Sequence, residues 1–238
     1  MRFPLHKDTA LTPDGRMVTF TCQAQEKPHN WFWHVRITGR NAAVGMTIAH
    51  ASYVDEIFAS HGLVVSEEVK YRGRSLVLAP TEDGTGWAAG WRGAKHSALF
   101  GGAGPMPDLA DAIALLDLLD IDERHSGLVL RPLAGSGVTL WSLRGTRYVP
   151  SAGMVSVFPR QDAPGLIPDG AGKQVSGGQV WSTSLGGDLG GGDLNGRKFV
   201  HVGATGVSAI DDDRGKVPFI TDEALETLIS SLSVEWAG

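Results

Sequence analysis

The sequence predicts an α+β fold made of two related halves, each a mainly antiparallel sheet with a closing C-terminal helix. Short runs that alternate apolar and polar residues fill much of the chain, and strongly amphipathic helical segments stand in its middle and at its end. The chain has 32 glycines among 238 residues, which favours many turns between short strands. The predicted halves are residues 1–125 and 126–238, which we interpret as an internal duplication.

The first half begins with strand-like segments. Residues 17–23 and 31–38 alternate in period two around the polar turn EKPHN, so they predict a hairpin. Residues 44–49 predict a further strand that leads into a helix. In that helix Ser52 suits the N-cap and Gly62 suits the residue after the C-terminus.

The rest of the first half is rich in strands and ends in the strongest predicted helix. Residues 63–71 and 74–80 predict two strands that meet at an Arg-Gly turn, and WAAGW and SALF predict two more. Asp108 suits the N-cap of the closing helix. The apolar stripe of that helix consists of Leu109, Ala112, Leu115, Leu116 and Leu119.

The second half repeats this order. Residues 138–143 and 147–149 predict strands across another Arg-Gly turn, and MVSVF, GQVWSTS and KFVHVG follow. A shift of 113 residues lays Asp108 on Thr221 and matches the apolar stripes of the two closing helices. The second stripe, which we expect to be buried against the sheet, consists of Leu225, Leu228, Ile229 and Leu232. Amphipathic helices also resemble one another because burial gives them all the same period. The match nevertheless favours a duplication with its boundary near residues 124–127.

The closing helix patterned ALETLISSL and the short extended tail SVEW resemble the end of Mog1/PsbP-like domains. The resemblance rests on the order of the elements and on these two segments. It implies an α/β/α sandwich with an antiparallel sheet, in a family whose members mostly act as non-catalytic accessory or binding proteins. No functional residue is carried over from it.

Composition and charge restrict the function classes. The formal net charge is −5 and no run of Lys or Arg is present, which argues against a nucleic-acid partner. No window approaches the run of about 20 apolar residues that a membrane span needs. The N-terminal segment MRFPLHKDTALTPDG lacks the features of a secretory signal, so a cytoplasmic location is expected. The single cysteine, Cys22, excludes an intramolecular disulfide and predicts a packed thiol.

Three segments invite a ligand interpretation, but each departs from the required pattern. Residues 101–104 are glycine-rich and precede a helix, yet they lack the third glycine and the lysine of phosphate loops. The segment LGGDLGGGDLNG gathers Asp188, Asp193 and Asn195 without the stacked repeats of calcium sites. The acidic run 211–213 fits a solvated turn next to Arg214, although a divalent cation there stays an alternative. We therefore expect no metal and no cofactor.

Histidines and carboxylates supply the candidates for acid-base catalysis. A histidine that ends a strand before a helix can meet a carboxylate of that helix, so that one group orients the other. Ordinary hydrogen-bonded histidines are the alternative. The catalytic candidates, if the protein is an enzyme, are His34, His50, Asp55 and Glu56.

Trp31 and Trp33 are the candidates for ligand binding. Strand periodicity places them on one face, where they belong either to the core or to an aromatic strip for an apolar ligand.

The leading functional prediction is a non-catalytic binding or accessory protein that engages a partner protein or a small apolar ligand near the junction of its halves. The predicted long loops 161–178 and 185–196 suit recognition. The alternative is a cofactor-independent enzyme that acts on small molecules by His and carboxylate acid-base chemistry. A structural subunit of a larger assembly is the third possibility.

Overall fold

The structure is a computed structural model, and it describes residues 3–39, 42–184, 197–211 and 221–237. The chain forms two compact units. Unit 1 contains residues 1–10, 16–31 and 144–238, and unit 2 contains residues 11–15 and 32–143. The predicted division into residues 1–125 and 126–238 does not separate these units, because residues 16–31 belong with the C-terminal part of the chain.

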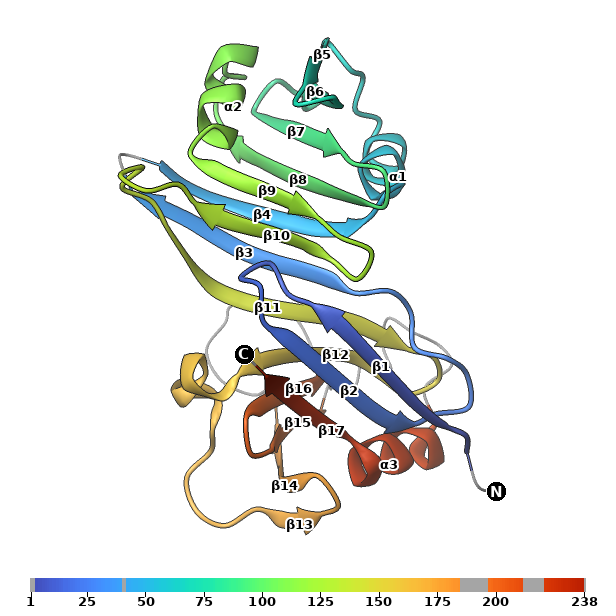
Figure 1. The fold of residues 1–238 in the computed structure, drawn as a ribbon. Coiled ribbons are helices and arrows are strands. Elements are labelled where there is room, and N and C mark those ends of the chain that lie inside the picture. Colours follow the sequence, from blue (N-terminus) through green and yellow to red (C-terminus); the bar gives the residue numbers. More distant parts are fainter. Residues whose placement is uncertain (1–2, 40–41, 185–196, 212–220, 238) are drawn as a thin grey trace. The chain divides into compact units, whose positions relative to one another are not determined.

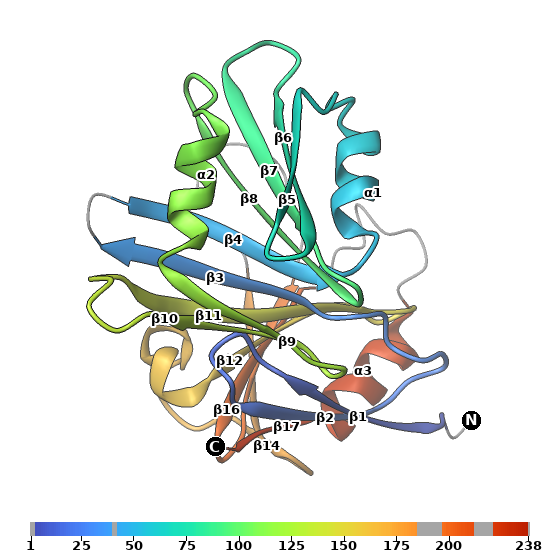
Figure 2. The ribbon, with the colours of Figure 1, turned by 45° about the horizontal axis from the view of Figure 1, so that its top comes forward.

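Unit 2 is built on an antiparallel sheet with the strand order β3-β4-β8-β7-β6-β5 (Figure 1). Figure 2 shows helices α1 and α2 on either side of strands β5 to β8. Strands β9 and β10 form a separate antiparallel pair. The elements are β3 (Phe32–Gly39), β4 (Ala42–His50), α1 (Tyr53–Ser60), β5 (Glu67–Tyr71), β6 (Arg74–Pro80), β7 (Gly86–Arg92), β8 (His96–Ala103), α2 (Leu109–Leu116), β9 (Leu119–Glu123) and β10 (Leu128–Pro132).

The central part of the sheet face opposite α1 is apolar. Val54 and Phe58 of α1 pack against Val77 and Ala79 on the first face. We call the second face the inner face of unit 2. Ten buried side chains form its central part: Trp33, Val35, Met46, Ile48, Leu76, Leu78, Ala89, Trp91, Ala98 and Phe100.

Unit 1 repeats the strand order. Its larger sheet runs β11-β12-β16-β15-β14-β13, and a smaller sheet runs β1-β2-β17 (Figure 1). The elements are β1 (Leu5–Leu11), β2 (Met17–Gln23), β11 (Thr139–Val149), β12 (Gly153–Pro159), η1 (Arg160–Asp162), η2 (Pro164–Leu166), β13 (Lys173–Val175), β14 (Gly178–Ser184), β15 (Arg197–Val202), β16 (Gly206–Asp211), α3 (Asp222–Ser231) and β17 (Ser233–Ala237).

The inner face of unit 1 is the sheet face toward α3 and β2. We matched its positions to the ten central positions of unit 2 by aligning the corresponding hairpins and the cross-strand residue pairs of the two sheets. It contains Gly145, Arg147, Val155, Val157, Val180, Ser182, Phe199, His201, Ser208 and Ile210.

The α+β class with mainly antiparallel sheets is confirmed, but some pairings differ from those predicted. Strand β2 pairs with β17 at the end of the chain and not with the following segment. The second predicted Arg-Gly turn, at Arg144-Gly145, is not formed, because these residues lie inside the continuous strand β11. In contrast, Arg72 and Gly73 form the predicted turn, with φ values of 49° and 79°. The dipeptide alone therefore does not decide between a turn and a strand.

Two helix details also differ. Helix α2 ends at Leu116, and Leu119 is the first residue of β9. Ser52 makes no capping hydrogen bond, because its hydroxyl donates to the carboxylate of Glu56 instead. Asp108 caps α2 as predicted, since its side chain accepts from the backbone N–H of Asp111 at 2.8 Å.

Candidate functional site

A groove of about 950 Å³ lies in unit 1 between α3 and the edge of the larger sheet. Helix α3 and strand β13 are neighbours at this edge (Figure 1). The volume is in the range of ligand sites in proteins. The lining residues are Lys173, Gln174, Val175, Ser176, Val180, Ser182, Phe199, Asp222, Glu223, Leu225, Glu226, Thr227, Ile229 and Ser230.

Helix α3 is positioned by its apolar stripe and its N-cap. The Thr221 hydroxyl accepts from the backbone N–H of Ala224 at 3.2 Å, which satisfies one of the free donors of the first turn. The predicted burial is confirmed for Leu225, Leu228 and Leu232. The fourth residue of the predicted stripe, Ile229, is half-buried because it lines the groove.

The groove is acidic along the helix and apolar at its floor. Asp222, Glu223 and Glu226 supply three carboxylates and Lys173 supplies one ammonium group, so the formal charge of the described lining residues is −2. Buried Val180 and Leu225 contribute to the apolar part. Such a surface attracts a cation that carries an apolar portion.

The corresponding place in unit 2 is closed by hydrogen bonds. Tyr71, at the end of β5, donates its hydroxyl to Asp117 at 2.7 Å. Arg72 donates to the carbonyl of Leu119 at 2.9 Å and to Asp117 at 3.2 Å. Burial, together with the bond to Asp117, raises the pKa of the Tyr71 phenol. These bonds tie the β5–β6 turn to the end of α2.

Smaller residues occupy the equivalent positions of unit 1. The hairpin pairs Tyr71 with Arg74 and Val175 with Gly178, so Val175 corresponds to Tyr71 and Ser176 to Arg72. When α2 and α3 are aligned on their N-caps, Asp108 and Thr221, Ser230 takes the position of Asp117. All three of these residues line the groove. The groove is therefore open where unit 2 has its three closing side chains.

Two polar side chains lie buried next to the floor of the groove. His201 pairs across the strands with Ser208 on one side and with groove residue Val180 on the other. Neither the His201 ring nitrogens nor the Ser208 hydroxyl finds a hydrogen-bond partner among the described residues. Burial lowers the pKa of His201 to about 4. The matching pair in unit 2 is apolar, Trp91 and Ala98.

The sequence candidates for catalysis belong to unit 2, whereas the groove belongs to unit 1. His34 Nδ1 lies 3.1 Å from the hydroxyl of Thr47. Asp55 forms an ion pair with Arg92 at 2.7 Å. His50 is the only one of the predicted histidines that meets a predicted carboxylate in the described residues: its Nε2 lies 3.6 Å from Glu56.

The His50 and Glu56 pair also includes Ser52. The Ser52 hydroxyl donates to Glu56 at 2.7 Å and lies 3.0 Å from Nδ1 of His50. Because its proton is used by Glu56, Ser52 accepts from His50 and is not activated as a nucleophile in this arrangement. The acid-base role of the pair stays a prediction.

Trp31 and Trp33 are both almost fully buried, with exposed fractions of 8% and 4%. Trp31 belongs to unit 1 and Trp33 to unit 2. Both positions agree with the core alternative, and the ligand-binding role stays a prediction. Cys22 is buried as well, and desolvation raises the pKa of its thiol to about 12.

The first residues of the glycine-rich segment 101–104 are part of a strand and not of a loop. Gly101 and Gly102 belong to β8 and pair with Ala88 and Trp87. Asp188, Asp193, Asn195 and residues 212–213 of the acidic run lie outside the described residues. Within the described ranges, no three His, Cys, Asp or Glu side chains gather as metal ligands.

Comparison with protein-family models, curated proteins and solved structures found no match. The resemblance to Mog1/PsbP-like domains therefore stays a prediction. In the part of the chain that the structure describes, no helix is long and apolar enough to cross a membrane.

No sequence motif marks the groove. Its lining residues come from several segments between residues 173 and 230, and most of them are polar residue types that are common on protein surfaces. A comparison of the two β-hairpins and the two closing helices would have shown that Tyr71, Arg72 and Asp117 are replaced by smaller residues.

Proposed function

We propose that the protein is a binding protein that holds a basic, extended segment of a partner protein in the groove of unit 1. The observation that carries this proposal is the groove itself, with its acidic wall and apolar floor. Its described lining residues include no histidine or cysteine, so the chemistry of the groove favours recognition over catalysis.

The edge strand β13 favours a peptide over a small amine. It stands last in the strand order of the larger sheet and contributes Lys173, Gln174 and Val175 to the groove. An extended peptide can add main-chain hydrogen bonds to such an edge while alternate side chains enter pockets. Basic side chains of the peptide would then face Glu226 and its neighbours on α3.

We also propose that the two units descend from a duplication. The strand orders β3-β4-β8-β7-β6-β5 and β11-β12-β16-β15-β14-β13 correspond strand by strand. Each is followed by a helix with a side-chain cap and then by a short strand. Glu123 accepts backbone N–H bonds from the β7–β8 turn, and Trp236, 113 residues later, bonds to Thr205 of the β15–β16 turn.

The duplication also accounts for the division of the chain. The strand before β3 is β2, and it pairs with β17; the strand before β11 is β10, and it pairs with β9. In both cases the first strand of one repeat pairs with the closing strand of the other repeat. This exchange explains why residues 16–31 belong to unit 1.

A peptide library tests the binding function. The probe is a set of eight-residue peptides in which Lys or Arg alternates with Val, Leu or Phe, and binding is measured by fluorescence anisotropy. We expect selected peptides to bind the full-length protein and to bind more weakly as salt increases, because exposed charges are screened. Glu226→Gln should weaken binding about fivefold, since it removes one exposed ion pair.

Glu82→Gln is the matched control, because Glu82 is an exposed carboxylate of unit 2. It should leave the affinity unchanged. If no basic peptide binds better than acidic peptides of the same apolar content, the proposed function is wrong. Equal losses from Glu226→Gln and Glu82→Gln would also contradict it, because they would indicate a general charge effect.

A further inference from the structure

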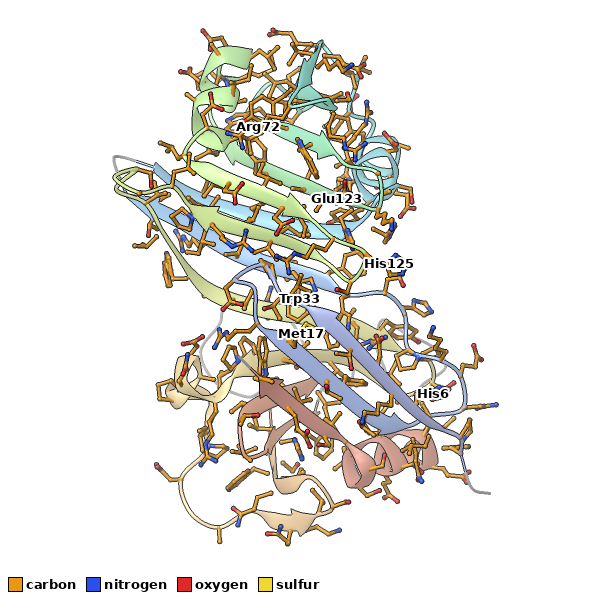
Figure 3. The ribbon with its side chains drawn as sticks, in the orientation of Figure 1. His6, Met17, Trp33, Arg72, Glu123 and His125 are labelled. Carbon is orange, nitrogen blue, oxygen red and sulfur yellow. The ribbon has the colours of Figure 1, made fainter. Side chains whose placement is uncertain are left out.

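Unit 1 has a second, smaller recess between β1 and the segment that follows β2. Its volume is about 220 Å³. Its lining includes four basic side chains, His6, Lys7, Lys27 and Arg147, and one carboxylate, Asp8. His6, which lies on β1 and lines the recess, is labelled in Figure 3. This set of side chains is opposite in charge to that of the groove.

Arg147 is the buried part of the recess, since its side chain is only 2% exposed. It donates to Asp8 at 2.9 Å and to the carbonyl oxygens of Pro28 and His29 at 2.7 to 3.2 Å. These four bonds account for four of the five N–H groups of a guanidinium. Among the described residues, no acceptor takes the second N–H of Nη1.

The plane of the guanidinium is fixed by aromatic rings. The Arg147 carbon Cζ lies 4.5 Å from the ring centre of Trp31 and 5.0 Å from that of Phe20. Such contacts stabilise a cation that is removed from water, and they orient the N–H donors of its guanidinium group. Val35 occupies the matching position on the inner face of unit 2, so the fold itself does not require a charge here.

The recess keeps an excess of positive charge. Asp8 is bonded to Arg147 and compensates one charge. Lys7 and Lys27 are exposed, and neither has a hydrogen bond or ion pair with a described residue. The two ammonium groups and the guanidinium against one carboxylate leave a formal charge of +2 before His6 is counted.

We infer that this recess is a binding site for a compact oxyanion, such as a phosphate group or a carboxylate. The free N–H of Arg147 would meet one oxygen of the anion, and Lys7 and Lys27 would neutralise its charge. The space suits such a group, since 220 Å³ corresponds to the liquid volume of about seven water molecules. The inference is independent of the peptide groove.

Equilibrium binding of anions to the full-length protein tests the site. The probes are inorganic phosphate and malonate, each titrated at constant ionic strength with chloride as the balancing anion, and the readouts are calorimetry and the melting temperature. We expect saturable binding of at least one probe at a stoichiometry of one. The two probes distinguish a phosphate site from a carboxylate site.

The lysines provide variants that keep the fold intact. Lys7→Gln and Lys27→Gln should each weaken binding about fivefold. Lys70→Gln is the matched control, since Lys70 is an exposed lysine on β5 of unit 2. It should have no effect.

Absence of saturable binding for both probes would overturn the inference, and so would an equal effect of all three lysine variants. Basic peptides provide the separating measurement: if they still bind while both anions fail, only the oxyanion site is wrong.

Discussion

The inner faces of the two units have the same arrangement of strands but different chemistry. In unit 2 the ten central positions of the inner face are all apolar or aromatic. In unit 1 the matching positions include Arg147, Ser182, His201 and Ser208. Unit 1 also contains both concavities described above. We conclude that the sheet of unit 2 is packed for stability, while the larger sheet of unit 1 has polar groups that packing does not require.

The closing side chains show the same contrast. Tyr71, Arg72 and Asp117 tie a hairpin to a helix in unit 2. In unit 1 a Cβ at Gly177 would overlap the carbonyl oxygen of Leu232, so the β13–β14 turn packs closely on the backbone after α3 without a long side chain. The turn is thus held in place while the neighbouring groove stays open.

The largest expected effect concerns the anchoring of α3. Leu228→Ala should destabilise the protein by about 2 to 5 kcal/mol, because it truncates a fully buried leucine and leaves a cavity. Chemical denaturation measures the change. Leu133→Ala, at a leucine that is 43% exposed, should change the stability by less than about 0.5 kcal/mol. Similar values for the two variants would mean that α3 is not packed on the inner face.

A smaller effect is expected from the polar pair in unit 1. The folded pKa of His201 is about 4 and the ordinary value is 6.5, so the unfolded chain binds the proton first as the pH falls. Stability should decrease between pH 6.5 and pH 4, by about 3 kcal/mol from this group. His201→Leu should flatten this part of the profile.

The matching comparison is with His34, which is hydrogen-bonded to Thr47. His34→Leu should leave the slope between pH 6.5 and pH 4 in place. If His201→Leu keeps the wild-type slope in urea denaturation, the imidazole is not buried in its neutral form.

The local signals in the sequence predicted much of the fold. The caps Asp108 and Thr221, the stripe of α3 and the turn at Arg72-Gly73 are each determined by neighbouring residues, and each is confirmed. The pairing of β2 with β17 joins residues at opposite ends of the chain, and strand periodicity does not specify such a partner.

The candidate sites were less accessible to sequence reasoning. The meeting of His50 and Glu56 followed from a strand that ends directly before a helix. The groove is open because Val175, Ser176 and Ser230 have smaller side chains than the residues that close the corresponding place in unit 2. Small residues form no sequence motif that would reveal such an opening. The burial of Arg147 depends on the distant residues Asp8, Phe20 and Trp31.

The most direct test of the central claim transfers the closing side chains of unit 2 to unit 1. The variant Val175→Tyr, Ser176→Arg, Ser230→Asp fills the groove, and its affinity for the best basic peptide is measured by fluorescence anisotropy. The control variant Tyr71→Val, Arg72→Ser, Asp117→Ser removes the same groups from unit 2. We predict that the first variant loses at least about tenfold in affinity, which corresponds to 1.4 kcal/mol, while it melts as a folded protein and the control variant binds like the wild type. Unchanged peptide affinity in a folded variant with the groove filled would contradict the account.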